Sequence, residues 1–67
     1  MKITKRVGVN LRRAREELGL SQEDLADRAG LHRTYLSGVE RGVRNPTVTV
    51  LEKIAKALKV KPSSLLD

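Results

Sequence analysis

The sequence predicts an all-α protein, built as a compact bundle of five short helices around an aliphatic core. Apolar residues recur at helical spacing along the chain, glycines and prolines interrupt this pattern at short intervals, and no segment alternates as a strand does. A chain of 67 residues has room for one small core, so we expect a single domain over residues 1–67.

The composition restricts both what stabilises the fold and what it binds. The chain has no Cys and one His, His32, so we expect no disulfide, no metal site and no other cofactor. Tyr35 is the only aromatic residue, which argues against a base-stacking platform for single strands. Lys and Arg number 14 against 8 Asp and Glu, and the net charge of +6 favours a polyanionic partner such as nucleic acid or acidic lipid.

The distribution of apolar residues gives no sign of a membrane or secreted protein. No apolar run approaches the ~20 residues of a membrane-spanning helix. Residues 1–6 lack the apolar core of a signal peptide. We therefore expect a cytoplasmic protein that contacts no membrane and that, if it binds DNA, is associated with the nucleoid.

The first two helices are delimited by clear local signals. The first has an apolar stripe at i, i+4, i+7 and i+11, formed by Val7, Leu11, Ala14 and Leu18. Gly19 ends it, because glycine accepts the left-handed conformation of a C-terminal cap. Ser21 starts the second helix, with Asp24 three residues later as in a capping box. Gly30 ends this helix after about two turns.

The later helices have weaker boundaries. Leu36 and Val39 point inward from a third helix that starts near His32, a mediocre cap, and ends at Gly42. Residues 43–46 form a loop, and the fourth helix is capped either by Asn45, with Pro46 in the first turn, or by Thr47. Its apolar face consists of Val48, Leu51, Ile54, Ala55 and Leu58. Pro62 opens a last short turn or helix over residues 63–66.

The two short helices between Ser21 and Gly42 are the most informative part of the chain. Isolated helices of this length are unstable in water, so packing must hold the pair together. A short rigid helix on a compact body fits the major groove of DNA, and in a helix-turn-helix the second helix presents its N-terminal residues to base edges. The alternative interpretation is a solvated polar surface, which every exposed helix has.

The outward stripe of the third helix carries the candidate base contacts Arg33, Thr34, Tyr35 and Ser37. Arg33 is long and doubly donating, which suits the O6 and N7 edge of guanine. Thr34 can donate, accept or contact a thymine methyl group. Tyr35 lies at the edge of the stripe, and Gly38 would let the helix approach DNA closely.

Candidate phosphate contacts lie at the edges of this stripe. Gln22 begins the second helix, where the free amides also favour an anion. Arg44 and Asn45 lie in the following loop, and His32 and Arg41 complete the set. The alternative for each is an ordinary solvent-facing residue.

Glu40 follows the inward residue Val39, where a lone carboxylate would be costly. We expect Arg15 in the first helix to be its partner. Such a pair is structural and not a catalytic acid, and the chain shows no other arrangement typical of an enzyme.

Residues 21–42 read SQEDLADRAGLHRTYLSGVERG and resemble the helix-turn-helix of the Xre/Cro family of bacterial and phage repressors. The resemblance continues through PTVTVLEKIAKAL and KPSSLL, and family positions match at Gln22, Ala26, Gly30, Ser37 and Glu40. It implies a lambda-repressor-like fold, double-stranded DNA as partner and a role as a sequence-specific transcriptional regulator. No small-molecule ligand is implied.

Within this family, LHRTYLSGVERGVRN is similar to the controller proteins of restriction-modification systems, which are small homodimers that bind palindromic sites. This resemblance implies that Arg33, Thr34, Tyr35 and Ser37 meet bases or nearby phosphates. It also suggests a dimer interface in the fourth helix and C-terminal segment, at Val48, Leu51, Leu65 and Leu66. The alternative is an antitoxin or coactivator-like module that binds a protein, for which Leu65 and Leu66 are the only spare apolar residues.

Overall fold

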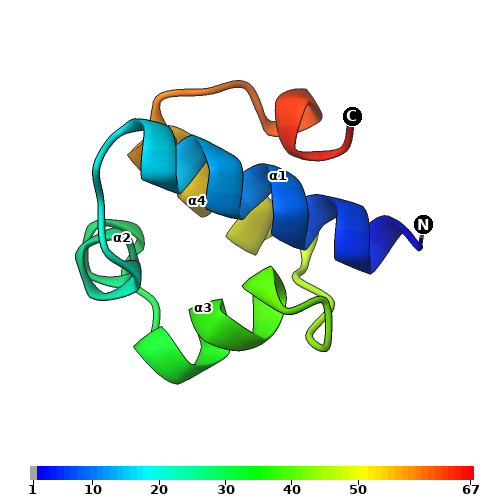
Figure 1. Cartoon of the computed structure of the whole chain (residues 1–67), viewed down its shortest axis with the longest axis horizontal. Helices are drawn as coiled ribbons and strands as arrows, with labels where there is room; N and C mark the ends of the chain where they lie inside the picture. The colour runs from blue at the N-terminus through cyan, green and yellow to red at the C-terminus, as the bar shows by residue number, and fades with distance from the viewer. Residues whose placement is uncertain (1) are drawn as a thin grey trace.

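The computed structural model describes residues 2–67 and contains four α-helices followed by one 3-10 helix (Figure 1). The elements are α1 (Ile3–Glu17), α2 (Gln22–Ala29), α3 (Arg33–Glu40), α4 (Val48–Leu58) and η1 (Pro62–Leu65). The expectation of five helices is thus corrected, because the last element is a short 3-10 turn. The amide of Leu66 donates to the carbonyl of Ser63 at 3.0 Å, which is the i→i+3 bond of a 3-10 helix.

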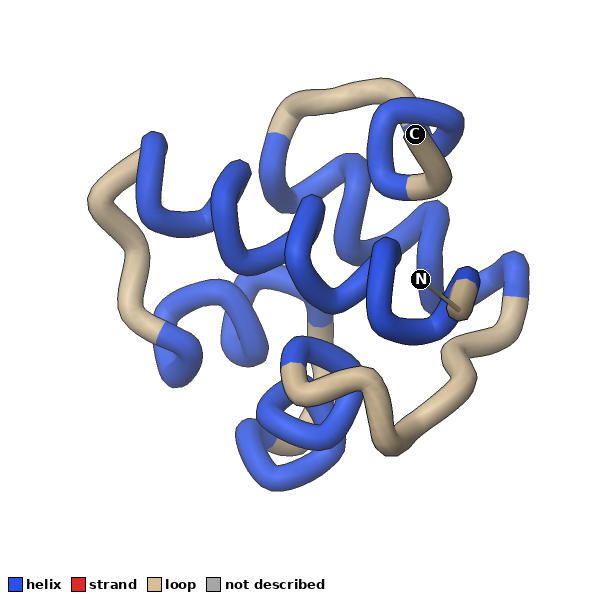
Figure 2. Tube along the Cα trace, turned by 45° about the vertical axis from the view of Figure 1, so that its right-hand side comes forward, coloured by secondary structure: helices blue, strands red, loops and turns tan. Residues whose placement is uncertain are grey.

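The helices pack as two adjoining pairs with η1 at one side. α1 contacts α3 and η1, α4 contacts α2 and η1, and α2 contacts α3. Figures 1 and 2 show α1 lying across the molecule, with α2 and α3 on one side of it and η1 on the other. No helix within residues 2–67 is both long enough and apolar enough to cross a membrane.

The core is aliphatic and draws on every element. Its buried members are Val7, Leu11, Leu25, Ala26, Ala29, Leu36, Val39, Ile54, Ala55, Leu58 and Leu65. The sequence suggests Leu65 for a dimer interface, but only 1% of it is exposed. The turn of η1 folds Leu65 inward onto α1 and α4, so this side chain belongs to the chain's own core and is not free to contact a second copy.

Local signals fix the start and end of α2 as the sequence predicted. Ser21 Oγ accepts from the amide of Asp24 at 3.0 Å, and the Asp24 carboxylate accepts from the amide of Ser21 at 3.2 Å. This reciprocal pair is a capping box. Gly30 ends the helix with φ of +69°, in the left-handed region that favours glycine.

The open choice at the start of α4 is resolved in favour of Thr47. Its hydroxyl oxygen accepts from the amide of Val50 at 3.1 Å, and α4 begins at the next residue, Val48. Asn45 therefore remains in the loop between α3 and α4, exposed to solvent.

The side chain of Asn10 joins α1 to the C-terminal segment. Asn10 Nδ2 on α1 donates to the carbonyl of Leu65 at 3.1 Å and to that of Asp67 at 2.8 Å. These carbonyls lie at the end of η1, where the helix leaves its last acceptors unpaired. Asn10 therefore fastens the C-terminal segment to α1.

Candidate nucleic-acid interface

The N-terminal end of α3 is held by no side-chain cap. His32 occupies the cap position in an extended conformation, with φ of −72° and ψ of 138°, and its side chain makes no capping hydrogen bond. No acidic residue lies in the first turn of α3. The amides of this turn therefore keep free donors at the positive end of the helix dipole, an arrangement that favours an anion.

Five of the predicted contact residues surround one shallow depression of about 260 Å³ on the surface. Its lining consists of Gln22 from α2 and Arg33, Thr34, Ser37 and Arg41 from α3 and its C-terminal cap. Arg33, Thr34 and Arg41 are exposed, and Ser37 is half-buried. The structure thus brings together candidates that the sequence separates by up to 19 positions, from 22 to 41.

The remaining predicted residues flank this depression. His32 lies at the start of α3 and is exposed, as are Arg44 and Asn45 in the loop that follows the helix. Tyr35 is half-buried and packs against the core, so its ring is partly engaged by the fold itself.

Gly38 does not have the part that the sequence suggested. It was expected to bring the α3 backbone close to DNA, but it is buried. The side chain of Arg44 passes over it: a Cβ atom built on Gly38 would lie 2.5 Å from Arg44 Cγ. The missing side chain therefore accommodates Arg44, a residue of the loop.

The ion pair expected between Arg15 and Glu40 is present and has two hydrogen bonds. Arg15 Nε lies 2.7 Å from Glu40 Oε2 and Arg15 Nη2 lies 3.0 Å from Glu40 Oε1. The two side chains are 11% and 3% exposed. Arg15 Nη1 also donates to the carbonyl of Leu20 at 2.8 Å, and the hydrogen bond with Glu40 raises the pKa of the Arg15 guanidinium.

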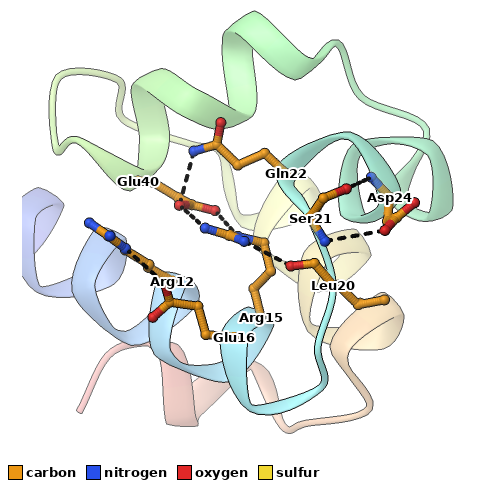
Figure 3. Close-up of polar contacts among 8 residues, drawn as sticks. All are labelled: Arg12, Arg15, Glu16, Leu20, Ser21, Gln22, Asp24 and Glu40. Carbon is orange, nitrogen blue, oxygen red and sulfur yellow. Dashed lines mark hydrogen bonds and ion pairs between the residues drawn. The ribbon is translucent and has the colours of Figure 1, made fainter.

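Gln22 joins this pair, a contact that no local pattern predicts. Its Nε2 donates to Glu40 Oε1 at 3.1 Å, so Glu40 connects α1, the start of α2 and the end of α3 (Figure 3). An amide nitrogen carries two hydrogens, and Gln22 also lines the depression. Gln22 is therefore oriented by the fold while its second N–H and its carbonyl remain available to a ligand.

Lys5 is a further cation beside the loop that sequence reasoning did not single out. It lies on α1, and a Cβ atom built on Gly42 would come within 3.0 Å of Lys5 Cγ. The stem of Lys5 therefore packs against the turn that follows α3, near Arg41 and Arg44 in the sequence. The separation of 37 residues between positions 5 and 42 explains why no local pattern revealed it.

Comparison with known proteins places the chain in a family. Residues 11–65 match the family model described as "Helix-turn-helix". The chain belongs to the helix-turn-helix family, of the Xre type. It is 47% identical over 66 residues to the uncharacterised HTH-type transcriptional regulator y4dJ of Sinorhizobium fredii, a match that covers 98% of this chain and 86% of y4dJ.

Solved structures of family members have the same fold. The restriction-modification controller protein C.AhdI from Aeromonas hydrophila superposes with a TM-score of 0.90 at 45% identity, covering 92% of this chain and 94% of C.AhdI. The biofilm regulator SinR, solved in complex with DNA, superposes with a TM-score of 0.87 at 39% identity, covering 91% of this chain and 98% of the solved SinR chain. The chain spans 56% of the full SinR of Bacillus subtilis.

Proposed function

We propose that this member of a family of DNA-binding transcriptional regulators acts as a homodimer on a palindromic operator, by binding and not by catalysis. The observation that supports it most is the depression shared by Gln22, Arg33, Thr34, Ser37 and Arg41. It combines long donors and short hydroxyl side chains along a short helix whose first turn has no side-chain cap. Base edges in the major groove of DNA are recognised by such a set.

Arg33, Thr34, Tyr35 and Ser37 are the proposed base contacts. Arg33 is exposed in the first turn of α3 and long enough to bond O6 and N7 of a guanine. Thr34 and Ser37 line the same depression and are short, so they suit close contacts. The ring of Tyr35 packs on the core while its hydroxyl provides a polar end, which suits a base or an adjacent phosphate.

Phosphate contacts are proposed for residues on both sides of α3. Gln22 lies on one side with a donor left after its bond to Glu40, and Arg44 and Asn45 lie on the other. His32 and Arg41 are exposed at the two ends of the helix. Contacts of this kind set the orientation of the protein on the duplex and carry no sequence information themselves.

A second copy is needed because one short helix contacts too few bases for high specificity. Two copies would place their α3 helices about 34 Å apart, one turn of DNA. The proposed interface uses Val48, which is 73% exposed, Leu66, which is 42% exposed, and the half-buried Leu51. Burying such exposed apolar side chains against a partner removes apolar surface from water and so favours association.

Among regulators, the controller of a restriction-modification system is the subtype we propose. The likeness to C.AhdI, which extends over 94% of that chain, supports it. Adjacent genes for an endonuclease and a methyltransferase are the expected genomic setting. An adjacent toxin gene would instead indicate an antitoxin.

Selection from a random-sequence duplex library tests the function directly. The wild-type chain should enrich a palindrome, and Arg33→Ala should lose about 1–3 kcal/mol of binding free energy on it while tolerating any base at one position of each half-site. Lys53→Ala, an exposed charge on α4, is the matched control and should retain full sequence preference. Absence of any enriched sequence, or a complex that contains only one protein copy, would overturn the proposal.

A further inference from the structure

Gly38 stands in the interior of α3, where glycine weakens a helix relative to alanine. Its backbone does not need glycine: positive φ angles among the glycines occur at Gly19, Gly30 and Gly42, and Gly38 is helical. The requirement at this position is therefore one of space and not of conformation.

The space is taken by the first part of the Arg44 side chain. A Cβ atom on Gly38 would lie 3.5 Å from Arg44 Cβ, an ordinary contact, but only 2.5 Å from Arg44 Cγ. Cγ is placed by the χ1 angle, so turning Arg44 to another χ1 rotamer relieves the contact with a methyl group at position 38. Such a turn redirects the whole guanidinium group.

The backbone of Arg44 is held by the same glycine. The carbonyl oxygen of Gly38 accepts from the amide of Val43 at 3.0 Å and from the amide of Arg44 at 3.2 Å. Gly38 therefore sets both where the loop leaves α3 and which way its arginine extends. The exposed guanidinium group is carried on a stem packed against α3, so less side-chain entropy remains to be lost when it binds a ligand.

We propose that Gly38 is a positioning residue for DNA binding, which acts by selecting the rotamer in which Arg44 reaches the phosphate backbone beside α3. The inference rests on the proposed function, since it requires that Arg44 contact DNA. It assigns to Gly38 an effect on affinity without any contact of its own.

A double-mutant cycle tests it, with Gly38→Ala, Arg44→Ala and the combined variant compared with the wild type on the best duplex that the wild type selects from a random library. Arg44→Ala removes Cγ and keeps Cβ, so alanine fits at position 38 in that background. Each single variant should weaken binding roughly tenfold per half-site, as expected for one charge-assisted hydrogen bond, and the double variant should bind no more weakly than Arg44→Ala.

Two further measurements distinguish a positioning role of Gly38 from a general destabilisation of the fold. The slope of log K against log salt should become shallower by about 0.9 for each lost phosphate contact in all three variants, and Lys53→Ala should leave it unchanged. The midpoint of thermal unfolding should rise on Gly38→Ala in the Arg44→Ala background, because alanine then gains helix propensity without a clash. In the wild-type background, Gly38→Ala should raise the unfolding midpoint by less, or lower it, because the clash with Arg44 opposes the gain in helix propensity.

The outcomes are distinguishable. Gly38→Ala binding as tightly as the wild type, or losses at positions 38 and 44 that simply add, would overturn the inference while leaving the proposed function intact. Further loss caused by Gly38→Ala in the Arg44→Ala background would mean that the methyl group meets DNA directly, which also overturns it. If the wild-type chain selects no duplex, the inference and the proposed function fail together, whatever the unfolding midpoints show.

Discussion

The two helices of the helix-turn-helix have the same length and opposite ways of beginning. α2 and α3 each have 8 residues. α2 starts with a capping box and has Glu23 and Asp24 in its first turn, whereas α3 starts at His32 with neither a side-chain cap nor an acidic residue. α2 is thus stabilised at its start by its own sequence, and α3 leaves its first amides available to a ligand.

The other end of α3 compensates for this open start. Leu36 and Val39 are 0% exposed, and Glu40 is bonded to Arg15 and Gln22. α3 is therefore fixed by contacts with α1 and α2 at its C-terminal half. A recognition helix can thus dispense with local stabilisation where tertiary contacts hold its far end, and its polar first turn then remains open.

The largest effect is expected from breaking the contact that holds the end of α3. Arg15→Met leaves Glu40 with Gln22 as its one remaining side-chain donor, and should lower the free energy of unfolding by about 2–3 kcal/mol, between the ranges for exposed and for fully buried pairs. Urea denaturation measures it. Arg12→Met is the matched control, because the Arg12–Glu16 pair is exposed at 65% and 56% and its loss should cost under about 1 kcal/mol. Equal effects of the two variants would refute the tertiary anchoring of α3.

A smaller effect on stability should distinguish the start of α2 from the start of α3. Ser21→Ala removes the capping box and should cost about 1 kcal/mol of unfolding free energy, with little effect on DNA affinity measured at a temperature where the variant is folded. His32→Ala should leave stability nearly unchanged, because His32 makes no capping hydrogen bond, and should weaken DNA binding. If His32→Ala destabilises the fold as much as Ser21→Ala does, the contrast between the helices is wrong.

The smallest effect concerns acid pH at the start of α2. The backbone N–H of Ser21 donates to the Asp24 carboxylate and lowers its pKa. A carboxyl group with a lowered folded-state pKa stabilises the fold at pH values above its unfolded pKa, and this contribution disappears as pH falls through the folded value, below about pH 4. Denaturation of the wild type and Asp24→Asn should show a difference in stability that is constant above about pH 5 and shrinks in acid. A difference that grows in acid would contradict the capping role.

Elements with local signals were predictable from the sequence. The caps at Ser21 and Gly30, the inward residues Leu36 and Val39, and the pairing of Arg15 with Glu40 all follow from spacing, from helix chemistry or from the cost of an unpaired charge. The structure contains each of them. The last segment, predicted as a short turn or helix, forms the 3-10 helix η1, because its four residues, Pro62–Leu65, are too few for an α-helical ladder.

What could not be predicted depends on contacts between distant residues. Asn10 bonds carbonyls 55 and 57 positions away, and Gln22 reaches Glu40 across 18 positions. Leu65 is an apolar residue near the C-terminus, and its sequence position does not tell whether it faces the core or a partner. The sequence suggests that Gly38 lets α3 approach DNA closely, since nothing in the α3 pattern reveals that Arg44 folds back over it.

We propose that the outward face and open first turn of α3 form the DNA-binding surface. Titration of the isotope-labelled chain with its selected duplex, followed by backbone amide NMR, tests this directly. We expect the largest chemical-shift changes at Gln22, in residues 33–38 and in residues 43–45, with little change at Lys53 and Lys56 on α4. Shifts concentrated on the α4 lysines, or spread evenly over the basic surface with α3 unaffected, would contradict it.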